Sequence, residues 1–285
     1  KWSEQKMGSG QQDQNNNESI EQFLKTSPLL PSADHPELSV QNNIINAGPP
    51  VKGLIEQEAL AILSWLVFMY FIVMQVIGSL FCLACLFGSN RAKHILQERK
   101  VNLFFFAFFS TVSAFANAGF TLLDDSLVSM QEESAFLLWL CVLILVGNTL
   151  YAPVMRAVVW VLYRLEGGTP ADDELNPGDI KMKKKFRRRA ALRYLLKSPR
   201  RCFTHLFPQT ETLWLVFTVA MLNCIQMAAI CGLDWHGPVF DGLKSNGYKF
   251  VNALFSSITT RNAGLNVVNV ADFSAPTLVL LVVMM

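Results

Sequence analysis

The chain has 285 residues, of which 52% are hydrophobic, and its mean hydropathy is positive. This apolar content is higher than soluble domains usually carry, so it excludes an ordinary soluble protein and predicts a membrane protein. The formal net charge of +2 says little about partners, because the charges are concentrated in separate segments and form no common patch.

The first 53 residues are rich in Gln, Asn, Ser and Pro, a composition that cannot bury a core and predicts a polar linker. Asn17 begins a formal glycosylation sequon, which matters only if this end faces outward. The chain starts at Lys1 without an initiator methionine or a signal peptide, and the apolar run after Ala275 is too short to span a bilayer. We therefore expect both ends to be truncations of a longer chain.

The first long apolar run, from Ala59 to Phe87, exceeds the roughly 20 residues needed to cross a bilayer and predicts a transmembrane helix. Residues 88–102 are charged and predict a loop. Residues 104–120 begin with aromatic side chains and end in a polar turn, which predicts a short helix followed by a loop. Glycine at position 119 permits backbone angles that aim successive carbonyl oxygens at one point, where they can replace the hydration shell of an alkali cation. The alternative is a buried turn between two packed helices.

Four acids follow this stretch: Asp124, Asp125, Glu132 and Glu133. They either raise the cation concentration at a pore mouth or are ordinary solvated loop acids, and the second interpretation is favoured. Residues 136–165 predict the next span. Polar residues and a proline at its mid-depth indicate a kink supported by neighbouring helices, contacts between helices, or both. These residues are Gly147, Asn148, Thr149 and Pro153.

Residues 181–201 contain eleven Lys or Arg and no acid. The positive-inside rule places this segment in the cytoplasm. Because it lies between two spans, contact with anionic lipid is favoured over binding to nucleic acid. The span from Thr212 to Leu233 then crosses outward, so residues 1–53 are predicted to be cytoplasmic and the polar turn of residues 104–120 to open outward. On this topology Asn17 carries no sugar.

A second copy of the helix-and-turn pattern lies in residues 250–265 and is also predicted to open outward. Phe255–Thr259 match Phe109–Ser113 type for type, and Asn262-Ala263-Gly264 repeat Asn117-Ala118-Gly119 one residue closer to the matched run. The two glycines are 145 residues apart, and apolar spans flank each loop. Internal repeats around a central site are common in transporters, so the pattern predicts two units of helix, pore loop and helix.

The run Phe109–Phe120 resembles the second pore loop of the plant high-affinity potassium and sodium transporters, the HKT family, which is related to the bacterial Trk and Ktr proteins. Residues 137–140 and 147–150 resemble the helix after that loop. Residues 260–264 and the ending LVLLVVMM resemble the third repeat, so the resemblance covers most of residues 55–285.

This resemblance implies an all-α membrane protein in which four helix–pore loop–helix units of one chain surround a central ion pore. The present chain would hold the second unit and most of the third. It departs from the family at Asn262, where plant members often have histidine, and at Leu265, where glutamate is common. Those departures indicate a divergent member.

Four segments are predicted: a cytoplasmic polar linker (1–53), the second repeat (54–165), a basic cytoplasmic loop (166–211) and the truncated third repeat (212–285). The predicted function is transport of Na⁺ or K⁺ down its gradient, with channel-like conduction through a selectivity filter of backbone carbonyls. The filter residues are Ala116, Asn117, Ala118, Gly119, Arg261, Asn262, Ala263 and Gly264. Ser113 and Arg261 are expected to support the loops, with the Arg261 charge paired behind the filter.

A nonconducting membrane scaffold or transporter subunit is the alternative function, and ion flux separates the two. An enzyme is not expected, because the four histidines have neither metal-ligand nor triad spacing. Five of the six cysteines lie in apolar runs and are expected to be reduced packing residues. No cofactor or metal is expected beyond the permeating Na⁺ or K⁺.

The expected partners are these ions and the lipid bilayer, with a homodimer left open and no nucleic acid. The resemblance implies a multi-pass protein of the plasma membrane. In the resembled family, the choice between Na⁺ and K⁺ depends on a first pore loop that would lie before Lys1.

Overall fold

The structure is a computed structural model that describes residues 49–166, 184–197, 203, 207–243 and 245–285. Within these ranges every regular element is a helix and no strand occurs, so the predicted all-α fold is confirmed. The expectations for Asn17 and for the rest of residues 1–48 lie outside the described residues.

The described helices form two successive units joined by a helix of the basic segment. The first unit contains α3 (Pro49–Gly88), α4 (Asn90–Glu98), α5 (Leu103–Phe115), η1 (Val128–Met130), α6 (Ser134–Gly147) and α7 (Tyr151–Leu165). The joining helix is α9 (Lys184–Lys197). The second unit contains α11 (Gln209–Asp234), η3 (Pro238–Phe240), α12 (Asn246–Asn262), η4 (Val270–Asp272) and α13 (Ala275–Met284).

Among the described residues, two helices are long and apolar enough to cross a membrane, one in each unit: residues 55–88 of α3 and the whole of α11. The bent pair of α6 and α7 adds a third if it forms one span. In α3 the buried side chains recur every three or four positions from Ile55 to Tyr70, which is the period of one helix face. Trp65 and Leu80, by contrast, are 63% and 61% exposed. An apolar outer face of this kind suits contact with lipid.

The short helices α5 and α12 begin at side-chain caps, which explains why each starts after a polar residue. The Asn102 side chain accepts hydrogen bonds from the backbone N–H groups of Phe104 and Phe105. Ser245 does the same for Gly247. Such caps satisfy amides that have no partner inside the helix.

Helices α3, α5 and α6 of the first unit pack against one another. The Tyr70 hydroxyl of α3 donates to the Val146 carbonyl of α6 at 2.9 Å, and the Trp139 ring N–H donates to the Gly78 carbonyl at 3.2 Å. A Cβ atom at Gly78 would lie 2.6 Å from the Thr111 methyl group of α5. Glycine therefore lets α3 approach α5 closely.

The predicted loop at residues 88–102 is wrong, because residues 90–98 form α4. Ser89 caps this helix by accepting from the Ala92 amide, and Ala92 and Leu96 are buried. The basic segment likewise contains a helix, α9, whose buried residues include Leu192 and Leu195. In the sequence of both helices, the few apolar residues that become buried are surrounded by charged residues.

The kink expected in residues 136–165 is a full break. Helix α6 ends at Gly147, α7 begins at Tyr151, and the two axes differ by 83°. The first helix also starts earlier than predicted, at Pro49, so the final residues of the proposed 1–53 linker are helical.

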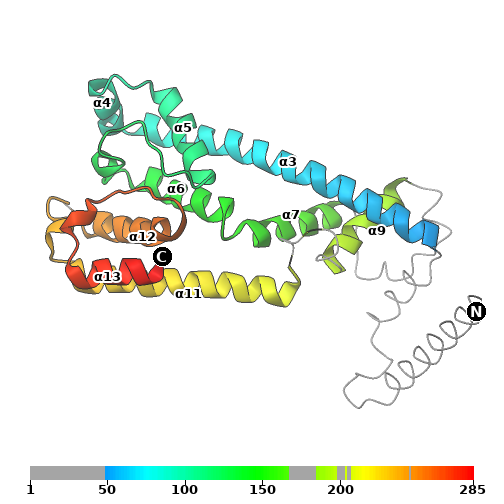
Figure 1. The fold of residues 1–285 in the computed structure, drawn as a ribbon. Helices are drawn as coiled ribbons and strands as arrows, with labels where there is room; N and C mark the ends of the chain where they lie inside the picture. Colours follow the sequence, from blue (N-terminus) through cyan, green and yellow to red (C-terminus); the bar gives the residue numbers. More distant parts are fainter. Residues whose placement is uncertain (1–48, 167–183, 198–202, 204–206, 244) are drawn as a thin grey trace, which may run out of the picture.

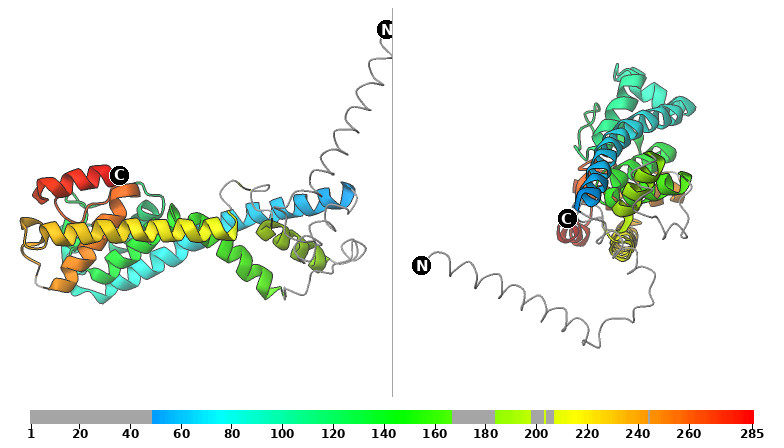
Figure 2. Two further views of the ribbon diagram at one scale, coloured as in Figure 1. Left: turned by 90° about the horizontal axis from the view of Figure 1, so that it is seen from below. Right: turned by 90° about the vertical axis from the view of Figure 1, so that its right-hand side faces the viewer.

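The two units pack side by side, with α6 against α12 and α7 against α11. Figure 1 shows α6 and α7 between the long helices α3 and α11. Helix α9 lies against the start of α3 and against α7, whereas α4 and α12 lie at the other end of the elongated molecule (Figures 1 and 2). The basic helix α9 and the helices α4 and α12 thus lie at opposite ends of the molecule.

Candidate functional site

The two predicted pore loops touch each other through their backbones. A Cβ atom at Gly119 would lie 2.6 Å from the carbonyl oxygen of Ala263 and 3.5 Å from the Cα atom of Gly264. A Cβ atom at Gly264 would in turn be 3.8 Å from the Cα atom of Gly119. The structure therefore brings together the two Asn-Ala-Gly motifs of the sequence repeat.

The loop after α5 turns sharply because two of its residues have positive φ angles. Asn117 has φ 53° and Gly119 has φ 75°, a region that asparagine tolerates and glycine adopts freely. The Ala118 amide donates to the Ser113 carbonyl at 2.9 Å. The Asn117 side-chain amide donates to the Phe115 carbonyl, and its Oδ1 atom is buried without a partner among the described residues.

Ser113 closes this loop with its hydroxyl group. The hydroxyl accepts a hydrogen bond from the Phe120 amide at 3.0 Å and donates one to the Phe120 carbonyl at 2.7 Å. One buried side chain thus holds both backbone groups of a residue seven positions later. This is the geometry expected of a loop-supporting residue.

The loop after α12 is shorter. Asn262 is still helical, Ala263 caps the helix, and Gly264 follows at once with φ 65°. The amides of Ala263 and Gly264 both donate to the Thr259 carbonyl. The first loop therefore reaches Gly119 four residues after the end of α5 at Phe115, and the second reaches Gly264 two residues after the end of α12 at Asn262.

No described residue donates a hydrogen bond to the carbonyl oxygens of the two loops. Neither Ala116–Gly119 nor Arg261–Gly264 contains a carbonyl that accepts a hydrogen bond from any described residue. Carbonyls at the end of a helix commonly lack a partner inside the helix, so part of this is expected. Folded proteins otherwise pair most of these groups, and eight free acceptors in two touching loops are suited to a cation.

The first loop rests on the end of α6. A Cβ atom at Gly147 would overlap the carbonyl oxygen of Phe115, which is the last residue of α5. The break between α6 and α7 begins at the next residue. Glycine at position 147 therefore sets how closely the broken helix approaches the base of the loop.

Arg261 does not form the expected ion pair with any described residue. Its Nε atom donates to the Met284 carbonyl of α13 at 3.2 Å, and its Nη2 atom is buried without a partner in the described part of the chain. The side chain thus connects the end of α12 to the end of α13 through a carbonyl instead of a carboxylate.

The acids after the first loop are largely engaged with α4 and its flanking residues. Arg91 pairs with Glu132, Arg99 pairs with Asp125 at 3.2 Å, and Ser89 donates to Glu133. These contacts reduce the field that free carboxylates would exert at a pore mouth. Asp124 remains fully exposed, 3.8 Å from Arg99.

Sequence reasoning missed a set of contacts between the segments that follow the two loops. The Leu127 amide donates to the Asn266 carbonyl at 2.9 Å, and the Asn266 amide donates to the Ser126 hydroxyl at 3.1 Å. Nearby, the Asn252 side chain donates to the Gln131 carbonyl at 3.0 Å. The partners are more than 120 residues apart, and no sequence motif marks them.

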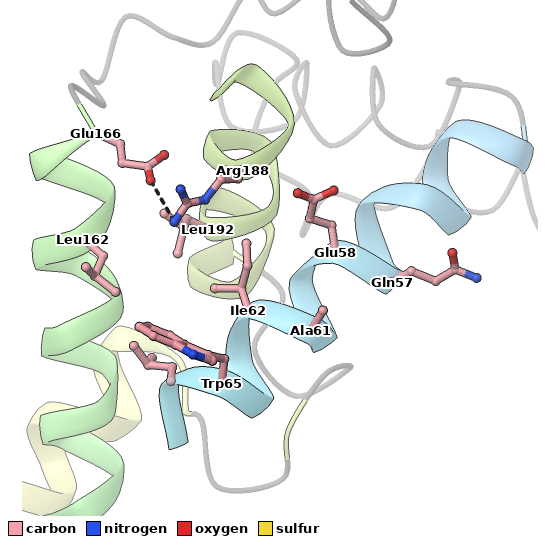
Figure 3. A pocket seen from close by; sticks show the side chains of 10 residues that line it. Gln57, Glu58, Ala61, Ile62, Trp65, Leu162, Glu166, Arg188 and Leu192 are labelled. Carbon is pink, nitrogen blue, oxygen red and sulfur yellow. Dashed lines mark ion pairs between the residues drawn. The ribbon is translucent and has the colours of Figure 1, made fainter. Parts of the chain in front are cut away.

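Two cavities lie toward the end of the molecule that carries α9. One, of about 510 Å³, is bordered by α3, α7 and α9, and Figure 3 shows Trp65 on its wall and the Arg188–Glu166 ion pair of 3.3 Å across it. The other, of about 650 Å³, is lined by Arg156, Trp160 and Lys197 among others. The described residues contain no group of three metal-ligating side chains.

Paired helix–loop–helix units with touching loops define a repeat-built, multi-pass membrane protein. Residues 46–285 match the TrkH family, described as a cation transport protein. This chain therefore belongs to the TrkH family, and the resemblance to the HKT and Trk proteins is confirmed.

Several curated relatives align with most of the chain. It is 30% identical over 234 residues to the cation transporter HKT1;3 of Oryza sativa subsp. japonica and 31% identical over 231 residues to the probable cation transporter HKT1;4 of the same plant. It is also 30% identical over 234 residues to the potassium transporter TRK1 of Candida albicans. These alignments cover 82%, 81% and 82% of this chain but only 40%, 42% and 20% of the three relatives.

Proposed function

We propose that this chain forms part of a transporter that conducts Na⁺ or K⁺ down its electrochemical gradient. The observation that supports this most directly is the pair of touching loops whose eight carbonyl oxygens accept no hydrogen bond from described residues. The names of the relatives, which include cation and potassium transporters, agree with the proposal.

In this proposal the carbonyls of Ala116–Gly119 and Arg261–Gly264 replace part of the water around a permeating ion. Carbonyl oxygens suit alkali cations because they carry partial negative charge without binding as tightly as carboxylates. Each loop supplies a single glycine, so the filter is short and discriminates less than a longer carbonyl filter. Loops from further repeats would complete the coordination.

The proposal is tested with the full-length protein in oocytes or in yeast cells that lack potassium uptake. We expect currents or uptake that follow the Na⁺ or K⁺ gradient and whose reversal potential moves with the permeant ion. A correctly folded, surface-expressed protein that passes neither ion would contradict transport and favour a nonconducting scaffold or subunit.

Anionic lipid at the basic end is the second part of the proposal. Arg156 donates to the carbonyls of Leu196 and Phe207 and has no carboxylate partner among the described residues, and it lines the 650 Å³ cavity. A half-buried cation beside a basic helix favours a lipid phosphate. Arg156→Gln should reduce the phosphatidylserine retained by the purified protein relative to phosphatidylcholine, and equal retention of both lipids by the native protein would contradict the site.

A further inference from the structure

We propose that Ser126 is a positioning residue for the ion filter, acting through a clamp that joins the two repeats just beyond their pore loops. The clamp consists of the Ser126 hydroxyl and the Leu127 amide on one side, and the backbone N–H and carbonyl of Asn266 on the other. The inference rests on the proposed filter, because it states what keeps the two loops in register.

The clamp is reciprocal. Asn266 donates its amide to Ser126 at 3.1 Å and accepts the Leu127 amide at 2.9 Å, so both backbone groups of one residue are held by two consecutive residues of the other repeat. Two bonds in opposite directions restrict sliding of one segment along the other more than a single bond does. Only backbone groups of Asn266 take part.

Ser126 adopts a conformation that this role requires. Its φ angle is 59°, which is uncommon for a residue other than glycine, asparagine or aspartate. The preceding turn is closed by a bond from the Ser126 amide to the Leu123 carbonyl. Residues held in such regions persist where surrounding contacts fix them, and they are often found at functional sites.

The position of the clamp connects it to the filter. Asn266 follows Gly264 by two residues, and Ser126 follows Gly119 by seven. Near the glycines, the loops meet through close backbone contact of Gly119 with Ala263 and Gly264. A small displacement of one loop along the other would therefore change where their free carbonyls point relative to each other.

Loss of the Ser126 hydroxyl should affect position more than folding. Ser126 is half-buried and Asn266 is exposed, so water can replace the missing acceptor. The Leu127 bond and the Asn252–Gln131 bond would still hold the two repeats together. Loss of the hydroxyl should therefore change ion selectivity while the protein stays folded, whereas an ordinary core mutation would destabilise the fold.

The test compares Ser126→Ala, Ser126→Gly and Ser126→Asn in the full-length protein, with the K⁺/Na⁺ permeability ratio from reversal potentials as the readout. Alanine and glycine both remove the hydroxyl, but only glycine also relieves the positive φ angle. We expect both to shift the ratio by roughly two- to tenfold, the range that corresponds to one hydrogen bond. Asparagine tolerates the backbone angle and offers a side-chain acceptor, so it should restore much of the native ratio.

Two control variants keep both hydrogen bonds of the clamp. Ser129→Ala removes a nearby hydroxyl in η1 that, within the described part of the chain, bonds to Asp125 and Arg99 of its own repeat. Asn266→Ala changes a clamp residue whose side chain is not used. Both should keep the native permeability ratio, and size-exclusion chromatography in detergent should show all five variants folded.

The inference is overturned if the native protein is ion-selective and Ser126→Ala and Ser126→Gly keep its ratio. It is also overturned if Ser129→Ala shifts the ratio as much, or if only alanine shifts it, since backbone strain would then be the cause. A native protein without selective current would instead refute the proposed function itself, so the two failures are distinguishable.

Discussion

Alanine at position 119 should impair conduction far more than alanine at position 264, although both glycines have similar backbone angles. Their φ angles are 75° and 65°, so each substitution pays about 1–2 kcal/mol for a left-handed conformation. The surroundings differ. A Cβ atom at Gly119 would be 2.6 Å from the Ala263 oxygen, whereas one at Gly264 meets nothing closer than the Gly119 Cα atom at 3.8 Å.

Relief of the overlap at Gly119 requires the Ala263 oxygen to move by roughly 0.8 Å, from 2.6 Å to the 3.4 Å at which ordinary contacts begin. Oxygen ligands of Ca²⁺, an ion close to Na⁺ in size, lie within ~2.3–2.6 Å, so a shift of this size away from the ion would remove the oxygen from the proposed coordination shell. If the lost interaction changes the barrier by about 1.4 kcal/mol, conductance changes about tenfold.

The assay is the whole-cell current of Gly119→Ala and Gly264→Ala in the full-length protein, divided by the amount at the cell surface. Gly264→Ala serves as the matched control for the cost of the positive φ angle. Equal currents from the two variants would refute the reasoning, because they would mean that the contact between Gly119 and Ala263 does not position a conducting group.

Two further substitutions test how the first loop is supported. Gly147→Ala would place a Cβ atom on the Phe115 carbonyl, a contact between backbones that no side-chain rotation relieves, so we expect a clearly lower unfolding temperature in detergent. Gly88→Ala, which meets no atom within 4 Å, should leave that temperature unchanged or raise it, and similar losses in both variants would contradict the packing argument. Ser113→Ala should cost about 1–3 kcal/mol, because both backbone groups of Phe120 lose the hydroxyl. Ser113→Thr should retain most of the stability, and an equal loss in the threonine variant would indicate a packing effect instead.

The pore helices and their loops were predictable because the sequence repeats itself there. The matched runs at Phe109 and Phe255 placed α5 and α12, and the glycines placed the turns. The helices α4 and α9 were missed because charged residues outnumber the few apolar positions that they bury, such as Leu96 and Leu195. Length and hydropathy identify spans, whereas a short amphipathic helix shows only in the periodic spacing of its apolar residues.

The contacts between the repeats could not be predicted from single residues. Ser126 and Asn266 are ordinary polar residues, and their bond depends on how α6 packs against α12. The partner of Arg261 could not be predicted for a related reason, because the backbone carbonyl that accepts its hydrogen bond is supplied by Met284 at the end of α13.

The two pore loops reach their glycines by paths of different length, four residues after Phe115 and two after Asn262. In a channel made of identical subunits, each substitution appears in every copy and the ring stays symmetric. Here each loop is encoded once, so a single codon change alters one side of the proposed filter and leaves the other as it was. Mutation and selection can therefore adjust ion preference in small, asymmetric steps, and equivalent positions in the two repeats need not tolerate the same residues.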